Sequence, residues 1–422
     1  MLRRSFLIGS AAFGATWLAP AVADTPAPAR PAGGRGGRIF RVTTLAPTGP
    51  GSITEAIKTK GPRIVVFEVG GVIDLNRTTL RINNPDITIA GQTAPSPGVT
   101  FIRGGIAVGE GCRNVVIQHI AVRPGEAGQA KKSGWECDGV YAYGASQVEV
   151  SNCSITWATD EGLSASGPRF EGANLAEWRA NTSHDIVFAS NIVAEGLSNS
   201  THSKGEHSKG TLIHDNVRNV RVTGSLYAHN VERNVLFKGG ASGIVRGNVI
   251  YNPAKRFTHF NLNAVDWEGH PWEPTEASIL DNIYLAGPST DPKAFAFNLG
   301  GEGPLDLTMS GNLALNAKGG AMPQLGRSGA KTAELVDRLG DAARTNPADA
   351  SALRATLADV LAKCGARPWE RDPIDARIVA DVTAGTGRII DSEQDVGGYP
   401  VRRETRAAFV EADWKLDTLT RR

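Results

Sequence analysis

Five segments in the middle of the chain share one pattern of hydrophobic and polar positions. Apolar residues alternate, a small polar residue follows, and aliphatic residues then continue the segment; the segments are residues 186–193, 220–227, 245–250, 279–284 and 309–314. Weaker copies begin near Ile87, Val115 and Val148. Alternation with period two is typical of β-strands, so the repeating unit is predicted to be β.

The small polar position recurs at intervals that favour a solenoid. Its occupants, Asn191, Ser225, Asn248, Asn282 and Asn312, are separated by 34, 23, 34 and 30 residues. When loops leave one face of a stack of coils, each repeat is expected to have a core of roughly constant length and a variable number of additional loop residues. Because no helix separates the strands, a parallel β-helix fits better than a βαβ sheet, and a β-propeller is the second choice. Inside the stack, the recurring Asn would form a ladder of amides.

The fold class is therefore predicted to be all-β, a single-stranded parallel β-helix over residues 39–325. Residues 331–339 and 352–361 have the spacing of amphipathic helices, and the whole of residues 326–422 is expected to pack on the solenoid as helical and extended segments. Residues 24–38 are rich in Pro, Ala, Gly and Arg, which predicts a flexible linker.

The first 23 residues have the features of a twin-arginine export signal. Arg3 and Arg4 precede an apolar run, and Ala21-Val22-Ala23 resembles a cleavage site, so we expect cleavage after Ala23. An uncleaved anchor is the alternative. No other stretch is apolar and long enough to span a bilayer, so the mature protein is expected in the periplasm or the medium, without membrane contact.

Composition excludes one broad class of partner and one class of metal site. The chain has 422 residues with 45 Lys and Arg against 43 Asp and Glu, which argues against a general nucleic-acid binder. Any cationic site must therefore be local. The four cysteines fit no zinc pattern and are predicted to be buried free thiols: Cys112, Cys137, Cys153 and Cys364.

Four acidic residues flank the strand that begins near Val148. Glu136 and Asp138 precede it, and Asp160 and Glu161 follow it. If successive coils stack, these carboxylates converge on one face, where a cation would have to offset their repulsion. Ligands that offer oxygen alone favour Ca²⁺ over zinc. The alternative is that all four are solvated acids in turns.

A second group of residues is cationic. It contains His207, Lys209, Arg233 and Lys238, and a Gly pair follows Lys238. Taken singly, such residues are usually solvated surface charges. Because an interval of five places Arg233 and Lys238 on opposite faces of a regular strand, the segment must bend if both are to line one groove.

With these motifs in this order, the chain resembles polysaccharide lyase family 1, the pectate lyases, over most of residues 39–320. An Asp-x-Asp turn, an Asp-Gly-Leu-like turn, a His-x-Lys-x-x-Leu-Ile segment and an Arg-x-Pro-x-x-Arg-x-Gly segment are typical of the family. The matching residues here are Glu136 and Asp138; Asp160, Gly162 and Leu163; His207, Lys209, Leu212 and Ile213; and Arg233, Lys238 and Gly240.

The resemblance implies a right-handed β-helix and β-elimination on polygalacturonate, an acidic polysaccharide. In that reaction the proton at C5 leaves, the oxygen at C4 is expelled, and an unsaturated product forms. Ca²⁺ on Asp138 and Asp160, with Glu136 and Glu161 as further ligands, would neutralise the C6 carboxylate. Arg233 would be the base, and Lys209, Lys238 and His207 would bind substrate.

The chain departs from the family pattern at several positions. Val235 stands where the family has Pro, Lys238 replaces Arg, Glu136 replaces Asp, and Ser164 lies near the position of another Asp ligand. Residues 165–205 are expected to form a long insertion that either overhangs the groove or is a plain surface loop.

Two other functions stay open at this point. A pectin lyase would act on methylated, neutral chains without calcium, and the acidic cluster disfavours it. A non-catalytic β-helix that binds acidic polysaccharide is the third candidate. Since a capped β-helix needs no partner, we expect a monomer.

Overall fold

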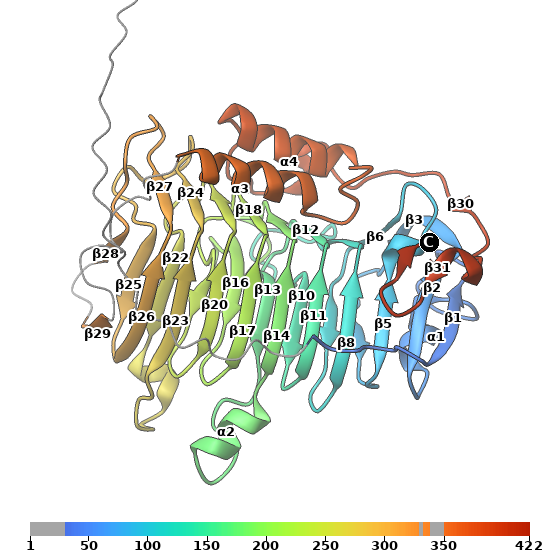
Figure 1. Cartoon of the computed structure of the whole chain (residues 1–422), viewed down its shortest axis with the longest axis horizontal. Helices are drawn as coiled ribbons and strands as arrows, with labels where there is room; N and C mark the ends of the chain where they lie inside the picture. The colour runs from blue at the N-terminus through green and yellow to red at the C-terminus, as the bar shows by residue number, and fades with distance from the viewer. Residues whose placement is uncertain (1–29, 329–331, 338–349) are drawn as a thin grey trace, which may run out of the picture.

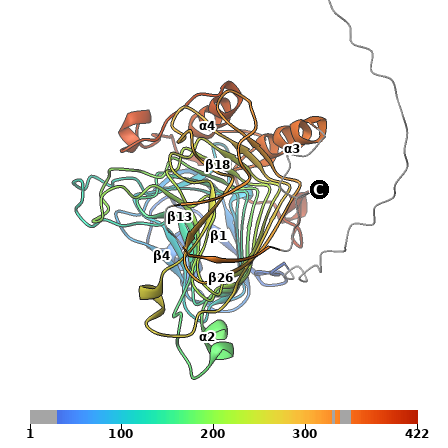
Figure 2. The same ribbon diagram turned by 90° about the vertical axis from the view of Figure 1, so that its left-hand side faces the viewer.

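Three long parallel sheets wind around one axis in the computed structural model, which describes residues 30–328, 332–337 and 350–422. Figure 1 shows the coils side by side along the long axis, and Figure 2 shows them end on. Each complete coil contributes one strand to each sheet, so the chain is a right-handed parallel β-helix, as predicted. The predicted export signal, residues 1–23, lies outside the described residues.

The three sheets are named here in the order in which the chain first enters them. The first sheet contains β1 (Arg38–Val42), β2 (Arg63–Phe67), β5 (Ile87–Ala90), β8 (Arg113–Gln118), β11 (Ser146–Ser151), β14 (His184–Ala189), β17 (Arg218–Thr223), β20 (Ser242–Arg246), β23 (Thr275–Leu280), β26 (Pro304–Ser310) and β29 (Glu334–Asp337). The second sheet contains β3 (Val69–Asp74), β6 (Val99–Ile102), β9 (Ala121–Arg123), β12 (Ser154–Thr156), β15 (Ile192–Ala194), β18 (Leu226–Ala228), β21 (Val249–Tyr251), β24 (Ile283–Leu285), β27 (Leu313–Leu315) and, antiparallel at one edge, β30 (Thr405–Arg406). The third sheet contains β4 (Leu80–Ile82), β7 (Ile106–Val108), β10 (Val140–Tyr143), β13 (Glu161–Ser166), β16 (Lys209–Ile213), β19 (Leu236–Phe237), β22 (Thr258–Leu262), β25 (Phe297–Gly301) and β28 (Leu325–Arg327).

The core is a set of aliphatic columns that run along the axis. In the first sheet, Val115, Val148, Ile186 and Val220 lie opposite one another in successive strands. All four are buried, because every second residue of each strand points inward. No single coil can bury these side chains, so stacking of the coils is what stabilises each one.

The predicted amide ladder is present. The Nδ2 group of Asn248 donates to Oδ1 of Asn282 at 2.9 Å, and that of Asn282 donates to Oδ1 of Asn312 at 3.0 Å. Ser225 continues the row, since its N–H donates to Asn248 and its hydroxyl accepts from the N–H of Asn191. The ladder satisfies polar groups of the turns between the first and second sheets inside the core.

The C-terminal region differs in part from its prediction. Helix α3 (Ala350–Lys363) contains the predicted 352–361 helix, and α4 (Pro373–Ala384), which was not predicted, follows it. Both pack their apolar side chains, such as Val360 and Ile378, on the outer face of the second sheet (Figure 1). The helix predicted over 331–339 is wrong where it is described: β29 pairs there with β26, because the open edge of the first sheet accepts a further strand.

Two boundaries also change. The N–H groups of Gly33 and Gly34 donate to Asn114 and Thr88, so the described end of the predicted 24–38 linker packs on the first sheet. Residues 165–205 are not one insertion, because they include β14 and β15 of a complete coil. Excursions leave that coil on both sides, and the first carries α2 (Leu175–Asn181).

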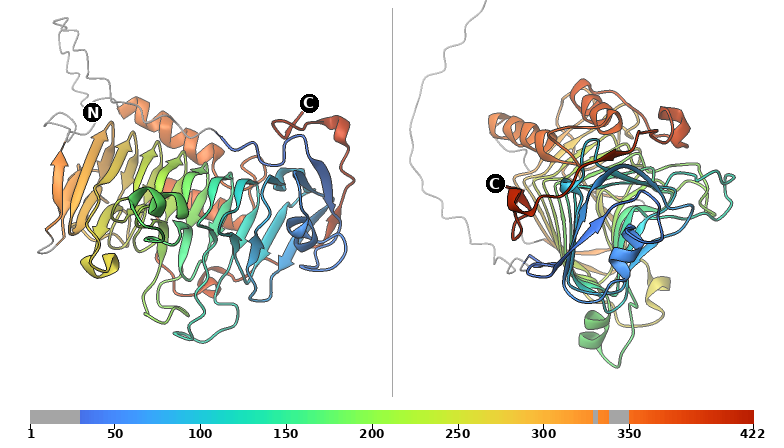
Figure 3. Two further views of the ribbon diagram at one scale, coloured as in Figure 1. Left: turned by 90° about the horizontal axis from the view of Figure 1, so that it is seen from below. Right: turned by 90° about the vertical axis from the view of Figure 1, so that its right-hand side faces the viewer.

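Two other parts of the chain lie against the N-terminal end of the β-helix. The short helix α1 (Ile53–Lys58) lies at the N-terminal end, and the chain returns to that end after α4 (Figure 3). There Phe409 and Trp414 pack on Ile64 and Val66 of β2.

The four cysteines are buried and free, as predicted. None of the helices in the described ranges has the length and apolar character that crossing a bilayer requires.

Candidate active site

A polar cavity of about 380 Å³ lies on the outer face of the third sheet. Strands β13, β16, β19 and β22, with the loops that enter and leave them, supply its lining. Its charged lining residues are Asp160, Glu161, Lys204, Arg233, Lys238 and Asp266. The stacking of neighbouring coils therefore brings together the motifs that lie far apart in the sequence.

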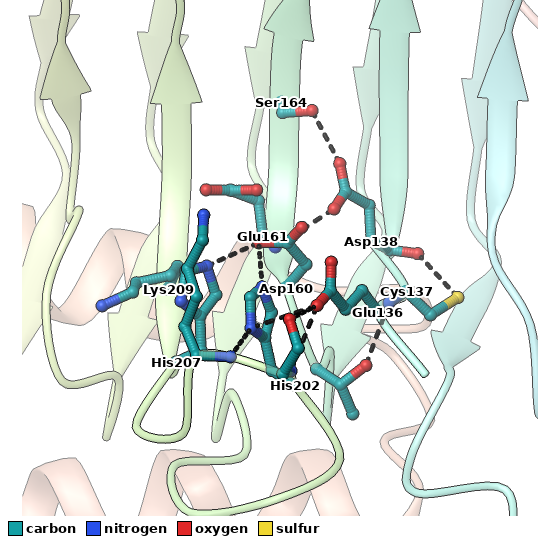
Figure 4. Close-up of polar contacts among 12 residues, drawn as sticks. Glu136, Cys137, Asp138, Asp160, Glu161, Ser164, His202, His207 and Lys209 are labelled. Atoms are coloured by element: carbon teal, nitrogen blue, oxygen red, sulfur yellow. Dashed lines mark hydrogen bonds and ion pairs between the residues drawn. The ribbon is translucent and has the colours of Figure 1, made fainter. Parts of the chain in front are cut away.

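Three of the predicted acids form one cluster beside this cavity. Asp138, Asp160 and Glu161 each offer a carboxylate oxygen, and these oxygens lie within 4.8 Å of one another. Asp138 comes just before β10, whereas Asp160 and Glu161 lie at the start of the adjacent β13. The hydroxyl of Ser164 donates to Oδ2 of Asp138 at 2.7 Å, and the Glu161 N–H donates to its Oδ1 (Figure 4).

Crowding of these carboxylates perturbs their ionisation. Burial, and then the neighbouring Asp160 carboxylate, raise the pKa of Asp138 to about 8. Burial also raises the pKa of Asp160, but hydrogen bonding and charge from His207 outweigh it and bring that pKa below its usual value. An oxygen-only cluster whose members resist joint ionisation is chemically suited to a calcium ion.

Glu136 lies to one side of the three-acid cluster. Its Oε1 accepts hydrogen bonds from the N–H and hydroxyl of Ser203, and it lies 3.4 Å from Nδ1 of His202 (Figure 4). Those hydrogen bonds hold the pKa of Glu136 below its usual value. The loop before β16 therefore engages Glu136.

One histidine contacts Asp160, and a second histidine stacks on the first. Nε2 of His207 lies 2.7 Å from Oδ1 of Asp160, and the ring of His202 stacks on that of His207 with centroids 3.6 Å apart (Figure 4). The backbone N–H of Lys204 donates to Nδ1 of His202. His207, which the sequence motif suggested for substrate binding, thus contacts a candidate metal ligand directly.

Arg233 lies beside the acidic cluster. Its Nη1 donates to Oε1 of Glu161. Burial lowers the pKa of Arg233, and Asp160 and Asp138 oppose that shift without cancelling it. Arg233 has a φ of 63°, so this segment is not a regular strand. Arg233 and Lys238 line the same cavity, as the sequence analysis required of a bent segment.

Both candidate substrate-binding lysines are paired with acids. Nζ of Lys209 lies 2.7 Å from Oε1 of Glu232, whose other oxygen accepts from Arg256. Lys209 is also opposite Glu161 in the β13–β16 register. Nζ of Lys238 lies 2.5 Å from Oδ2 of Asp266.

The sequence did not identify Glu232 and Asp266 as site residues. Glu232 had one signal, its place next to Arg233 in the motif. Asp266 belongs to no motif, and η2 (Ala264–Trp267) brings it to the cavity.

No protein-family model matches the chain. A probable pectate lyase C from Aspergillus terreus is 31% identical over 263 residues, which cover 62% of this chain and 53% of the relative. One from Aspergillus flavus is 28% identical over 373 residues, or 87% of this chain and 78% of the relative. The match thus spans about half the length of the first relative. The thermostable pectate lyase PL 47 superposes with a TM-score of 0.52 at 13% identity, over 78% of this chain and 92% of that chain, which shows a shared fold.

Proposed function

We propose that the protein is a pectate lyase that cleaves polygalacturonate by calcium-assisted β-elimination and leaves 4,5-unsaturated ends. The observation that carries this proposal is the contact between Arg233 and Glu161 within the cluster of Asp138, Asp160 and Glu161. An elimination next to a carboxylate needs a base and a positive charge at adjacent positions, and this arrangement would supply both. The relatives named as probable pectate lyases support the same activity.

The calcium ligands in this proposal are Asp138, Asp160 and Glu161, with Glu136 able to contribute from the side. Their oxygen-only donor set and the raised pKa of Asp138 support a hard cation. When bound, Ca²⁺ would neutralise the substrate C6 carboxylate and stabilise charge that develops as the C5 proton leaves. His207 and Ser164 would position Asp160 and Asp138 for this task through their hydrogen bonds.

Arg233 takes the C5 proton in this account. Burial lowers the pKa of Arg233 and so favours its neutral form. The neutral guanidine can then act as the base at alkaline pH. Lys209, Lys238 and His207 bind the sugar chain in this proposal, and Lys238 and His207 line the same cavity as Arg233. The C4–O bond breaks as the C4–C5 double bond forms, and the leaving oxygen takes up a proton from the protonated Arg233 or from solvent water, so the net reaction consumes no further reactant.

The proposal also includes the location of the protein and its partner. The twin-arginine motif supports export to the periplasm or the medium. The exported protein is proposed to be a monomer whose partner is an acidic polysaccharide.

Product formation from polygalacturonate tests the function. The protein is incubated with calcium or with a chelator, and the ultraviolet absorbance of the unsaturated product is followed. Activity that needs calcium supports the proposal; chelator-resistant activity on methylated pectin would point to a pectin lyase, and none on either substrate to a binding protein. Arg246→Lys is the control for Arg233 variants, since Arg246 is an exposed arginine paired with Asp281 on the first sheet.

A further inference from the structure

At one end of the cavity, the carboxylate of Asp266 offsets the positive charge of Lys238. The Lys238 side chain is buried, and its ammonium group donates to Oδ2 of Asp266 at 2.5 Å. Asn263 donates to the same oxygen at 3.1 Å. Lys238, Asn263 and Asp266 all line the cavity, so this end presents an ion pair and amides in place of a free cation.

Asp266 is fixed in place by more than Lys238. Nη1 of Arg169 donates to the Asp266 carbonyl oxygen at 2.9 Å. The next residue, Trp267, is fully buried, its indole N–H donates to Asp215, and Phe170 packs against its ring. Burial raises the pKa of Asp266, but the hydrogen bond and charge of Lys238 outweigh it and keep that pKa below its usual value. The carboxylate is therefore ionised and held in the cavity wall.

Arg233 and Lys238 lie at different ends of the cavity, and a bound metal would affect the acidic partner of only one of them. Glu161, the partner of Arg233, belongs to the three-acid cluster, so a bound cation would compete with Arg233 for it. Among the residues that the structure describes, the groups arranged to hold a metal include Glu161 but not Asp266. Asp266 therefore stays paired with Lys238 when the proposed metal binds.

A sugar carboxylate at the Lys238 end would meet the fixed carboxylate of Asp266. Like charges placed close together at a binding site disfavour binding, whereas a methyl ester carries no charge. The ester oxygens could also accept hydrogen bonds from the amides of Asn261 and Asn263, which line this end. Chemistry at this position thus favours a neutral uronate ester.

On the basis of the proposed function, we propose that Asp266 is a specificity-determining residue and that the substrate is partly methyl-esterified pectin. The sugar at the acidic cluster keeps its free carboxylate, and the sugar at the Lys238 end carries the ester. This distinguishes the protein from a lyase for fully de-esterified chains and from a lyase that needs no free carboxylate.

The test compares kcat/KM on polygalacturonate and on partly methyl-esterified pectin, both with calcium. Wild type is expected to prefer the partly esterified substrate. Asp266→Asn should move the ratio of the two values toward polygalacturonate by about tenfold. Asp266→Glu, which keeps the charge, should retain the wild-type preference. Asp281→Asn, which removes an equally charged partner of Arg246 far from the cavity, should stay within about twofold.

The outcomes separate the inference from the function on which it rests. A wild type that prefers polygalacturonate, or an Asp266→Asn variant that forms unsaturated product with an unchanged ratio, overturns the inference and leaves the lyase activity standing. If wild type forms no unsaturated product from either substrate, the proposed function fails and the inference fails with it. Melting temperatures of the variants verify that each one is folded.

Discussion

Nη1 of Arg233 donates a hydrogen bond to Oε1 of Glu161, although 72 residues separate the two in the sequence. The bond joins the proposed base to a proposed calcium ligand. In the calcium-free protein Glu161 therefore stabilises the charged guanidinium, which is the form that cannot accept a proton. Occupation of the acidic cluster would withdraw Glu161 from Arg233, so calcium would act on the base as well as on the substrate.

Replacement of Arg233 by Lys should remove turnover and leave binding. The shorter ammonium group keeps a positive charge but cannot reach the position of the guanidinium, and loss of a positioned base costs about 10²–10⁴-fold in rate. We expect kcat to fall by that amount while the affinity for oligogalacturonate, measured by calorimetry, changes little. Arg246→Lys should behave as wild type. Near-normal turnover in Arg233→Lys would rule out this residue as the base.

The rate should rise with pH into the alkaline range. The base must be deprotonated, and burial brings the pKa of Arg233 below its usual value. The deprotonated fraction, and with it kcat/KM, should therefore increase as pH rises. A pH–rate profile at saturating calcium measures this. An optimum at acidic pH would contradict the assignment of Arg233.

Asp138 should make the calcium-free protein less stable as pH rises. Its pKa is raised from 3.8 to about 8 in the folded state, so its stabilising contribution is complete below about pH 4 and is lost as pH rises through about 8. In chelator, Asp138→Asn should therefore melt above wild type beyond pH 8 and lose most of the stabilisation that calcium gives wild type. Scanning calorimetry with and without calcium checks both effects. Equal calcium stabilisation of the two proteins would place the ion elsewhere.

Much of the fold was predictable because its physics is local and repeated. Alternation with period two and the recurring Asn191-to-Asn312 positions are visible in the sequence, and each describes one coil. The 331–339 helix was predicted wrongly because its spacing suits a helix, while the open edge of β26 pairs with Glu334–Asp337 as a strand. Edge pairing depends on a neighbour that local spacing does not reveal.

The candidate site was predictable only in its motifs. Asp138, Asp160 and Arg233 stand in recognisable order, and stacking of coils brings them together. The pairing of Lys238 with Asp266 depends on how η2 folds back over the third sheet, fixed by Trp267. Such contacts between side chains of different loops have no signature in sequence spacing.

The amide ladder should contribute measurably to stability. Asn282→Ala removes the acceptor of the buried backbone N–H of Asn248 and of one of its two Nδ2 hydrogens, while the other Nδ2 hydrogen keeps the Val222 carbonyl as its acceptor. We expect a loss of about 2–4 kcal/mol in the free energy of unfolding, measured with urea. Asn83→Ala, at an exposed position, should change it by less than about 0.5 kcal/mol. A loss as small at Asn282 would mean that water replaces the ladder.

Mass spectrometry of the products formed from polygalacturonate tests the central claim most directly, because elimination and hydrolysis leave ends that differ by one water. In the presence of a chelator, the wild-type protein should form no product. Addition of calcium should yield fragments with 4,5-unsaturated ends from wild type but not from Arg233→Lys. Saturated ends, or unsaturated ends formed equally well in chelator, would contradict calcium-assisted β-elimination at this site.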